Sequence, residues 1–138
     1  MINITPTNQQ DIAHFLEEQW TIEDKEHYGE VGWQDASFLF KAEENGLIIG
    51  VAMGRIQSGV VLIEDIIVHR EQRGKGVGKL LVAKIESFAK ENQAHKVWGY
   101  TGKGWPAVDF YKSLGYQVIG ELPKHFHQKD FVIISKNI

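Results

Sequence analysis

The segment from Glu64 to Leu81, EDIIVHREQRGKGVGKLL, constrains the fold more than any other part of the chain. An apolar run typical of a strand ends in a loop, and helical periodicity begins among three alternating glycines, Gly74, Gly76 and Gly78. The start of a helix exposes unpaired backbone N–H groups, and glycines let a ligand approach the backbone closely. The alternative is an ordinary glycine turn, but the interleaved basic residues favour a strand–loop–helix junction that binds phosphate groups.

Two common nucleotide-binding motifs do not fit this loop. A P-loop requires Gly-Lys followed by Ser or Thr, whereas Gly78-Lys79 is followed by Leu80. The dinucleotide fingerprint requires a third glycine at the position of Lys79. We therefore expect another kind of phosphate-containing ligand.

The N-terminal quarter of the chain predicts a short strand and two helices. The strand spans residues 2–5, and Pro6 is suited to the first turn of the helix that follows. Four residues at helical spacing give this helix an apolar face: Ile12, Phe15, Leu16 and Trp20. Residues 21–35 are polar and predict a second short helix and a loop.

The remaining residues predict strands with two further helices. The dipeptides Asn45-Gly46 and Ser58-Gly59 predict hairpin turns, so that three strands follow one another and the third spans residues 60–68. The helix beginning near Gly76 has an apolar face made of Val77, Leu80, Leu81, Ile85 and Phe88. The last elements are a strand at 95–101, a helix opened by Pro106 and closed by Gly115, and strands at 116–122 and 130–136.

This order, β-α-α-β-β-β-α-β-α-β-β, predicts an α/β (α+β) fold with a mixed, mostly antiparallel sheet. We expect six to seven strands flanked by about four helices. The chain shows no repeat or linker, and its 138 residues, 43% of them hydrophobic, suit one domain spanning residues 1–138.

Composition excludes several classes of protein. The sequence contains no run of about 18 apolar residues that could form a membrane helix, and its N-terminus lacks the pattern of a signal peptide. It contains no cysteine, so it has neither disulfides nor cysteine metal sites. We expect a cytoplasmic protein that does not associate with membranes.

The charge distribution indicates the kind of partner. The net charge of −3 argues against nucleic acid as the main ligand. Between Glu17 and Asp35 the sequence has seven acidic residues and one lysine, a local charge of −6, so the rest of the chain is positive. This polarity suits an anionic ligand in one place and a cationic ligand in another, although a solvated acidic helix face explains it equally well.

The basic loop and a later segment together resemble a known family. Arg73-Gly74-Lys75-Gly76-Val77-Gly78 is similar to the diphosphate loop R/Q-x-x-G-x-G/A of the GNAT superfamily of acyl-CoA-dependent N-acyltransferases, and the strand order and AVDFYKSLGY (107–116) are similar as well. The resemblance covers most of the chain and implies acetyl-CoA as acyl donor and no metal. Backbone amides from Arg73 to Lys79, including Lys75, Val77 and Gly78, would hold the diphosphate. The backbone of Ile66, Ile67 and Val68 would pair with the pantetheine arm.

One position departs from the family pattern. Many members have an asparagine that contacts the pantetheine three residues before the alanine corresponding to Ala107. The chain has Gly104 there, so we expect that contact to be looser or made by backbone or Lys103.

Acyl transfer to an amine requires a base for the amine and a proton donor for the leaving thiolate. Glu64 and Asp65 lie on the strand near the expected thioester, with side chains on opposite faces unless a bulge intervenes. A buried carboxylate beside a second acid would have a raised pKa, which suits a base. We favour Glu64 as base with Asp65 as substitute; a structural role is an equal alternative for Asp65. By resemblance, the Tyr111 hydroxyl would protonate the coenzyme sulfur, the alternative being a core tyrosine.

In this family the acceptor is usually bordered by the segment after the first helix and by the loop between the last two strands. An acidic, aromatic rim would favour a cationic amine. The candidate acceptor-binding residues are Trp20, Glu23, Asp24, Tyr28 and Trp33. Both tryptophans suit the core equally well, and for Trp20 we favour the core. His125 and His127 lack further metal ligands nearby, and we expect them on the rim.

The leading interpretation is an acetyl-CoA-dependent N-acetyltransferase acting on a small cationic amine by direct attack in a ternary complex. The absence of cysteine disfavours an acyl-enzyme. Two alternatives stay open: an acyl-CoA-binding module without turnover, and an enzyme that acetylates peptides or proteins. We expect a monomer or a homodimer.

Overall fold

The computed structural model describes all residues, Met1–Ile138, as two compact units, Met1–Gly32 and Trp33–Ile138. The first unit contains one helix, α1 (Gln9–Tyr28). The Asn8 side chain caps α1 by accepting a hydrogen bond from the Asp11 backbone N–H at 3.0 Å. None of the helices in the structure is both long and apolar enough to cross a membrane.

Two predictions for the first unit are wrong. Residues 2–5 form no strand, because four alternating residues do not supply the neighbouring strand that a ladder of hydrogen bonds requires. Residues 21–28 continue α1 instead of starting a second helix. Thr21 is accommodated because its hydroxyl donates to the Glu17 carbonyl at 2.6 Å, and the helix ends before Gly29, whose φ is 80°.

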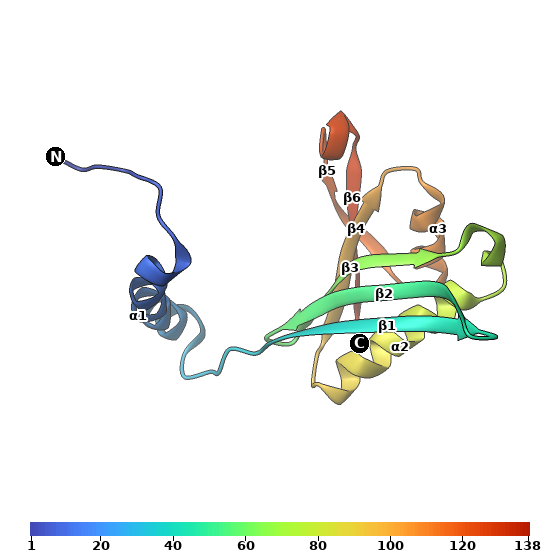
Figure 1. Cartoon of the computed structure of the whole chain (residues 1–138), viewed down its shortest axis with the longest axis horizontal. Coiled ribbons are helices and arrows are strands. Elements are labelled where there is room, and N and C mark those ends of the chain that lie inside the picture. Colours follow the sequence, from blue (N-terminus) through green and yellow to red (C-terminus); the bar gives the residue numbers. More distant parts are fainter. The chain divides into compact units, whose positions relative to one another are not determined.

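The second unit is a six-stranded mixed sheet with two helices (Figure 1). The strand order is β1-β2-β3-β4-β6-β5, and the only parallel pair is β3 with β4. The strands are β1 (Asp35–Glu44), β2 (Leu47–Gln57), β3 (Val60–Val68), β4 (Lys96–Gly102), β5 (Gln117–Leu122) and β6 (Phe131–Asn137). The helices are α2 (Val77–Glu91) and α3 (Pro106–Ser113), with single 3₁₀ turns at Arg70–Gln72 and Phe126–Gln128. The predicted mixed, mostly antiparallel sheet is confirmed, with three α-helices in place of about four.

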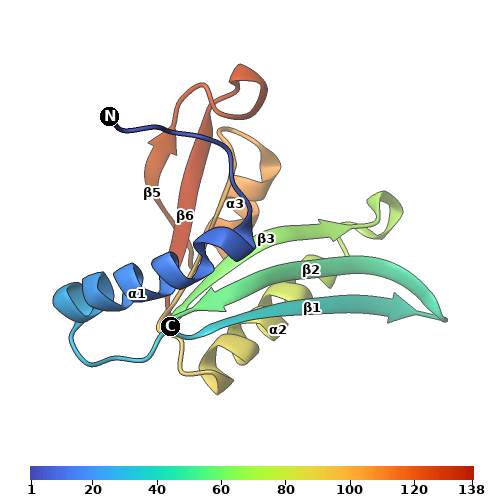
Figure 2. The same ribbon diagram turned by 60° about the vertical axis from the view of Figure 1, so that its left-hand side comes forward.

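Both predicted hairpin turns are confirmed. Asn45 and Gly46 have φ values of 53° and 78°, and Ser58 and Gly59 have 44° and 89°. Two successive residues with positive φ form the kind of tight turn whose twist matches antiparallel strands. These turns set the register of β1, β2 and β3, which lie side by side with α2 across one face (Figure 2).

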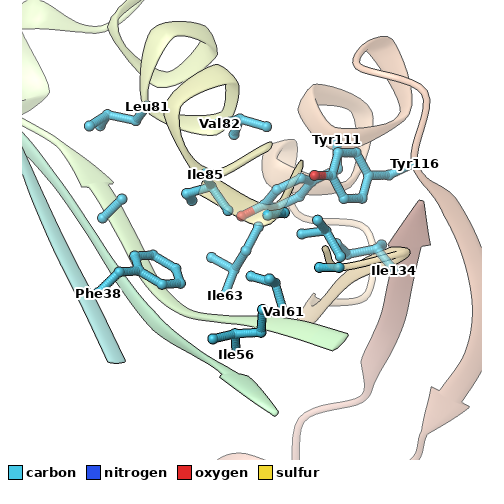
Figure 3. Packing of buried hydrophobic residues seen from close by; sticks show 14 of the residues in the cluster. Phe38, Ile56, Val61, Ile63, Leu81, Val82, Ile85, Tyr111, Tyr116 and Ile134 are labelled. Atoms are coloured by element: carbon cyan, nitrogen blue, oxygen red, sulfur yellow. The ribbon is translucent and has the colours of Figure 1, made fainter. Parts of the chain in front are cut away.

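The core lies between that face and α2. Figure 3 shows Leu81, Val82 and Ile85 of α2 directed towards the strand residues of the sheet. The buried residues on the strands include Phe38, Ala52, Ile56, Val61, Ile63, Val97, Val132 and Ile134. The prediction that Leu80 belongs to the apolar face of α2 is wrong, because Leu80 is 70% exposed. At this level of the helix, Val82 points into the core instead.

Tyr116 carries a buried hydroxyl without a hydrogen-bond partner. Its ring lies beside the Tyr111 ring, with centroids 5.4 Å apart, and beneath the Lys136 ammonium group. A buried polar group without a partner loses its hydration and gains no compensating bond.

We therefore expect Tyr116→Phe to stabilise the protein by about 1 kcal/mol, measured by chemical denaturation. Tyr100→Phe is the matched control, because Tyr100 is 41% exposed and its hydroxyl is not among the buried groups without a partner. A loss of stability in Tyr116→Phe would contradict the assignment of this hydroxyl as unpaired.

Candidate active site

The strand β3 contains a bulge at Glu64. Ile63 pairs with Gly54 and Asp65 pairs with Met53, so that Glu64 is an extra residue without a partner on β2. A bulge of this kind shifts the alternation of side chains by one residue.

The bulge places both acids on the same face of the sheet. Before it, Ile63 points into the core; after it, Ile66 and Val68 pack against the same core. Glu64 and Asp65 are both exposed and therefore lie on the face opposite α2. Opposite faces were predicted for Glu64 and Asp65 unless a bulge intervened, and the bulge is present. The prediction that one of the two carboxylates is buried is wrong.

Gly54 makes room for this geometry. A Cβ atom at Gly54 would overlap the Leu62 carbonyl oxygen and would lie 2.8 Å from a ring carbon of Phe38. No residue with a side chain fits there without moving β3 or the core.

The strands β3 and β4 part where the bulge begins. Their parallel pairing includes only Val60, Val61 and Leu62 on β3, the last opposite Trp98, although both strands continue further. In Figure 1, β4 turns steeply away from β3 beyond this point. From Ile63 to Val68, β3 therefore has an unpaired edge on its β4 side. An extended ligand can pair with such an edge as an added strand, and this edge contains the predicted Ile66, Ile67 and Val68.

The predicted loop leads into α2 as expected. Gly76 is the N-cap in a left-handed conformation, with φ of 86°, and no side chain caps the helix. The first hydrogen bond of the helix start joins the Leu80 N–H to the Gly76 carbonyl at 3.1 Å. The N–H groups of Val77, Gly78 and Lys79 have no acceptor within the helix and are available to an anion.

Side chains attach this loop to β3. The Arg73 Nε donates to the Val68 carbonyl at 3.0 Å, and the Lys75 ammonium donates to the Gln72 side chain at 3.2 Å. A shallow groove of about 450 Å³ lies beside them and is lined by Ile67, Val68 and Arg73 among the predicted residues. His69 and Arg70 also line it; the sequence analysis had not included them.

Two predicted loop residues have packing roles. The Val77 side chain belongs to the core, and a Cβ atom at Gly78 would lie 3.1 Å from the Phe110 ring of α3. The absence of a side chain at Gly78 thus lets α2 approach α3. Only the backbone N–H groups of these two residues stay candidates for ligand binding.

Glu64 has a partner that the sequence analysis missed. The Arg55 Nε donates to Glu64 Oε1 at 2.8 Å, and this bond together with the carboxylate charge raises the pKa of Arg55. Asp65 takes part in no hydrogen bond or ion pair. The signal was present: with a turn at Ser58-Gly59, Arg55 falls opposite Leu62 and diagonal to Glu64.

Tyr111 lies in α3 and is 6% exposed. Its ring contacts the rings of Phe110 and Tyr116 at centroid distances of 5.2 and 5.4 Å. Burial raises the pKa of Tyr111 to about 12. The hydroxyl therefore keeps its proton over the usual pH range and is available as a hydrogen-bond or proton donor.

An aromatic cluster lies on β4 and the loop between β5 and β6. Tyr100 contacts His125, Phe126 and Phe131, with ring centroids 5.8, 6.2 and 6.4 Å away. Continuing the β3–β4 register past Leu62 and Trp98 would place Tyr100 opposite Glu64, across the gap between the parted strands. The sequence predicted this loop on the rim, whereas nothing in the sequence pattern had pointed to Tyr100.

None of the predicted acceptor-binding residues belongs to a strand. Trp20, Glu23, Asp24 and Tyr28 are on α1, where the Glu23 carboxylate lies 3.4 Å from the His27 imidazole. Trp33 is the first residue of the second unit. The prediction that Trp20 lies in the core is wrong, because Trp20 is 59% exposed and α1 has no buried residues. Their role in binding an acceptor stays a prediction.

The parted strands, the free edge of β3 and the uncapped helix start together are a shape and charge arrangement that would suit a long ligand with phosphate at one end. The sequence profile of the Acetyltransferase (GNAT) family matches residues 7–116. The chain therefore belongs to the GNAT family of acetyltransferases, which confirms the resemblance.

Two curated proteins are similar over part of the chain. Streptothricin acetyltransferase of Streptomyces lavendulae is 37% identical over 59 residues, covering 42% of this chain and 31% of that protein. N-acetylaspartate synthetase of Xenopus tropicalis is 32% identical over 95 residues, covering 67% and 35%. The chain thus spans about a third of the length of these relatives.

Solved structures share the fold. An acetyltransferase from Bacillus cereus has a TM-score of 0.82 at 20% identity and covers 99% of this chain and 98% of its own. A structure described as a putative streptothricin acetyltransferase from Bacillus anthracis, in complex with acetyl coenzyme A, has a TM-score of 0.70 at 23% identity, covering 74% and 63%.

We expect Gly54→Ala to lower the free energy of unfolding by about 3 kcal/mol, because the added methyl group overlaps β3 and Phe38. Gly32→Ala is the control, since a Cβ atom there meets nothing within 4 Å. Urea denaturation of both variants measures the difference, and equal stabilities would contradict the close approach at Gly54.

Proposed function

We propose that the chain is an acetyl-CoA-dependent N-acetyltransferase that transfers an acetyl group to the primary amine of a small cationic acceptor. The observation that carries the proposal is the order of features along one continuous segment, from β3 through the loop to the start of α2. Two exposed acids, a free backbone edge and an uncapped helix start follow one another from Glu64 to Lys79.

The donor would lie along this track. The N–H groups of Val77, Gly78 and Lys79 and the nearby basic side chains would bind the diphosphate of acetyl-CoA. The edge of Ile66–Val68 would pair with the amides of the pantetheine arm. This orientation directs the thioester towards the bulge and its two carboxylates.

The acceptor would react by direct attack. An ammonium group first gives a proton to a carboxylate of the Glu64-Asp65 pair, since only the neutral amine has a lone pair. Its nitrogen then forms a bond to the thioester carbonyl carbon, and the C–S bond breaks. The leaving thiolate takes a proton from the Tyr111 hydroxyl. The nitrogen then loses its second proton to the Tyr111 oxygen, which restores the hydroxyl. The products are an N-acetyl amine, coenzyme A and one free proton.

The acids favour a cationic acceptor, because a carboxylate without a partner attracts a positive charge. The relatives' names describe different acceptors: streptothricin in one, a ribosomal protein alanine in an Escherichia coli enzyme with a TM-score of 0.70. The free Asp65 at the bulge supports a cationic amine for this chain.

An amine panel tests the proposal. Purified protein, acetyl-CoA and a thiol reagent are combined with polyamines, aminoglycosides, amino acids and short peptides. The proposal predicts thiol release with at least one small cationic amine. Tight binding of acetyl-CoA by calorimetry without turnover of any amine would identify a binding module, and turnover of peptides alone would identify a peptide acetyltransferase.

We expect Tyr111→Phe to lower kcat by about 100-fold on the best amine, with little change in KM, because proton donation acts on the leaving group. With a pKa of about 12, Tyr111 stays protonated, so the wild-type rate should show no loss from its ionisation up to about pH 10. Initial-rate assays of thiol release from pH 7 to 10 measure both effects. A variant with full kcat would remove Tyr111 from the mechanism.

A further inference from the structure

The two acids at the bulge differ in their surroundings. Glu64 Oε1 accepts a hydrogen bond from the Arg55 Nε at 2.8 Å. The Arg55 side chain is 44% exposed to solvent and the Glu64 side chain 33%. Arg55 and Glu64 therefore form a pair with no net charge at the surface of the sheet. Asp65 is adjacent on the same face but has no partner.

The pairing follows from the backbone. Arg55 lies opposite Leu62 on the face away from α2, so its side chain reaches diagonally to Glu64. Asp65 lies opposite Met53, whose thioether cannot neutralise a carboxylate. As a result of the bulge, Glu64 pairs with Arg55 and Asp65 has no partner.

The geometry of the pair has a chemical consequence. A carboxylate that is held by a guanidinium group keeps a fixed orientation, and its second oxygen can still accept a hydrogen bond. An unpaired carboxylate provides the net negative charge that attracts an ammonium group, and it can accept a proton without losing an existing ion pair.

We propose that Arg55 is a positioning residue that holds and neutralises Glu64, and that Asp65 is the acid that binds the acceptor's ammonium group and takes its proton. This inference rests on the proposed function. The O–H bond forms on the Asp65 carboxylate, the N–H bond of the ammonium group breaks, and its electron pair stays on nitrogen for attack on the thioester. Glu64 accepts a hydrogen bond from a remaining N–H through its second oxygen. The sequence had favoured Glu64 as the base.

The isosteric substitutions Asp65→Asn and Glu64→Gln separate the two roles. On the best cationic amine, Asp65→Asn should lower kcat/KM by about 100-fold and Glu64→Gln by about 10-fold. The smaller effect at Glu64 is expected because the amide that replaces its carboxylate keeps one oxygen to accept from Arg55. The reverse order of effects would overturn the assignment.

Variants of Arg55 test positioning. Arg55→Met should lower kcat by about 10-fold without raising KM, since the released Glu64 loses its orientation but the site gains negative charge. Arg55→Lys can pair with Glu64 again and should recover kcat to within about threefold of the wild type. If Arg55 had a purely structural role, Arg55→Met and Arg55→Lys would both have the kcat of the wild type at temperatures where all variants are folded.

Lys41→Met is the matched control, because it removes an exposed cation from the same sheet face, where Lys41 pairs with Glu43 instead. Its kinetics should equal those of the wild type, and thermal melts establish that every variant is folded. A raised KM with normal kcat in Arg55→Met would show that Arg55 binds a substrate and would overturn the inference. A wild-type protein without activity on any amine would instead refute the proposed function itself.

Discussion

The bulge at Glu64 is the constraint on which the rest of the site depends. β3 has one residue more than β2 can pair between Gly54 and Met53, and Gly54 is the residue that leaves space for it. The bulge turns two successive carboxylates to one face and restores the inward alternation at Ile66. Parallel pairing with β4 also ends just before it. The two exposed acids, the free edge and the gap between the central strands therefore all begin at the same place on β3.

The helix start and the bulge have complementary electrostatics. The N-terminus of α2 presents N–H groups without acceptors, reinforced by Arg73, whereas the bulge presents negative charge. Because Arg55 neutralises Glu64, that charge is concentrated on Asp65. The two ends of the track therefore suit two different ligands, one with phosphate groups at the helix start and one with a positively charged amine at the bulge.

Local signals predicted most of the sheet. Turn residues with positive φ fixed both hairpins, and Pro106 and Gly115 marked the ends of α3, because these residues act through their own backbone conformation. The errors came from features that depend on distant residues. A strand at residues 2–5 needs a neighbour, and the inward turn of Val82 depends on the angle at which α2 packs. Likewise, the loop glycines were identified, but the packing of Gly78 against Phe110 could not be, since α3 follows much later in the chain.

We propose that acetyl-CoA lies along the β3 edge and the start of α2. A titration of ¹⁵N-labelled protein with coenzyme A, followed by ¹H–¹⁵N correlation spectra, tests it residue by residue. We expect the largest shifts at the amides of Val77, Gly78 and Lys79 and along Ile66–Val68, with small shifts at the β1–β2 turn. Binding that leaves these amides unmoved and shifts another part of the sheet would contradict it.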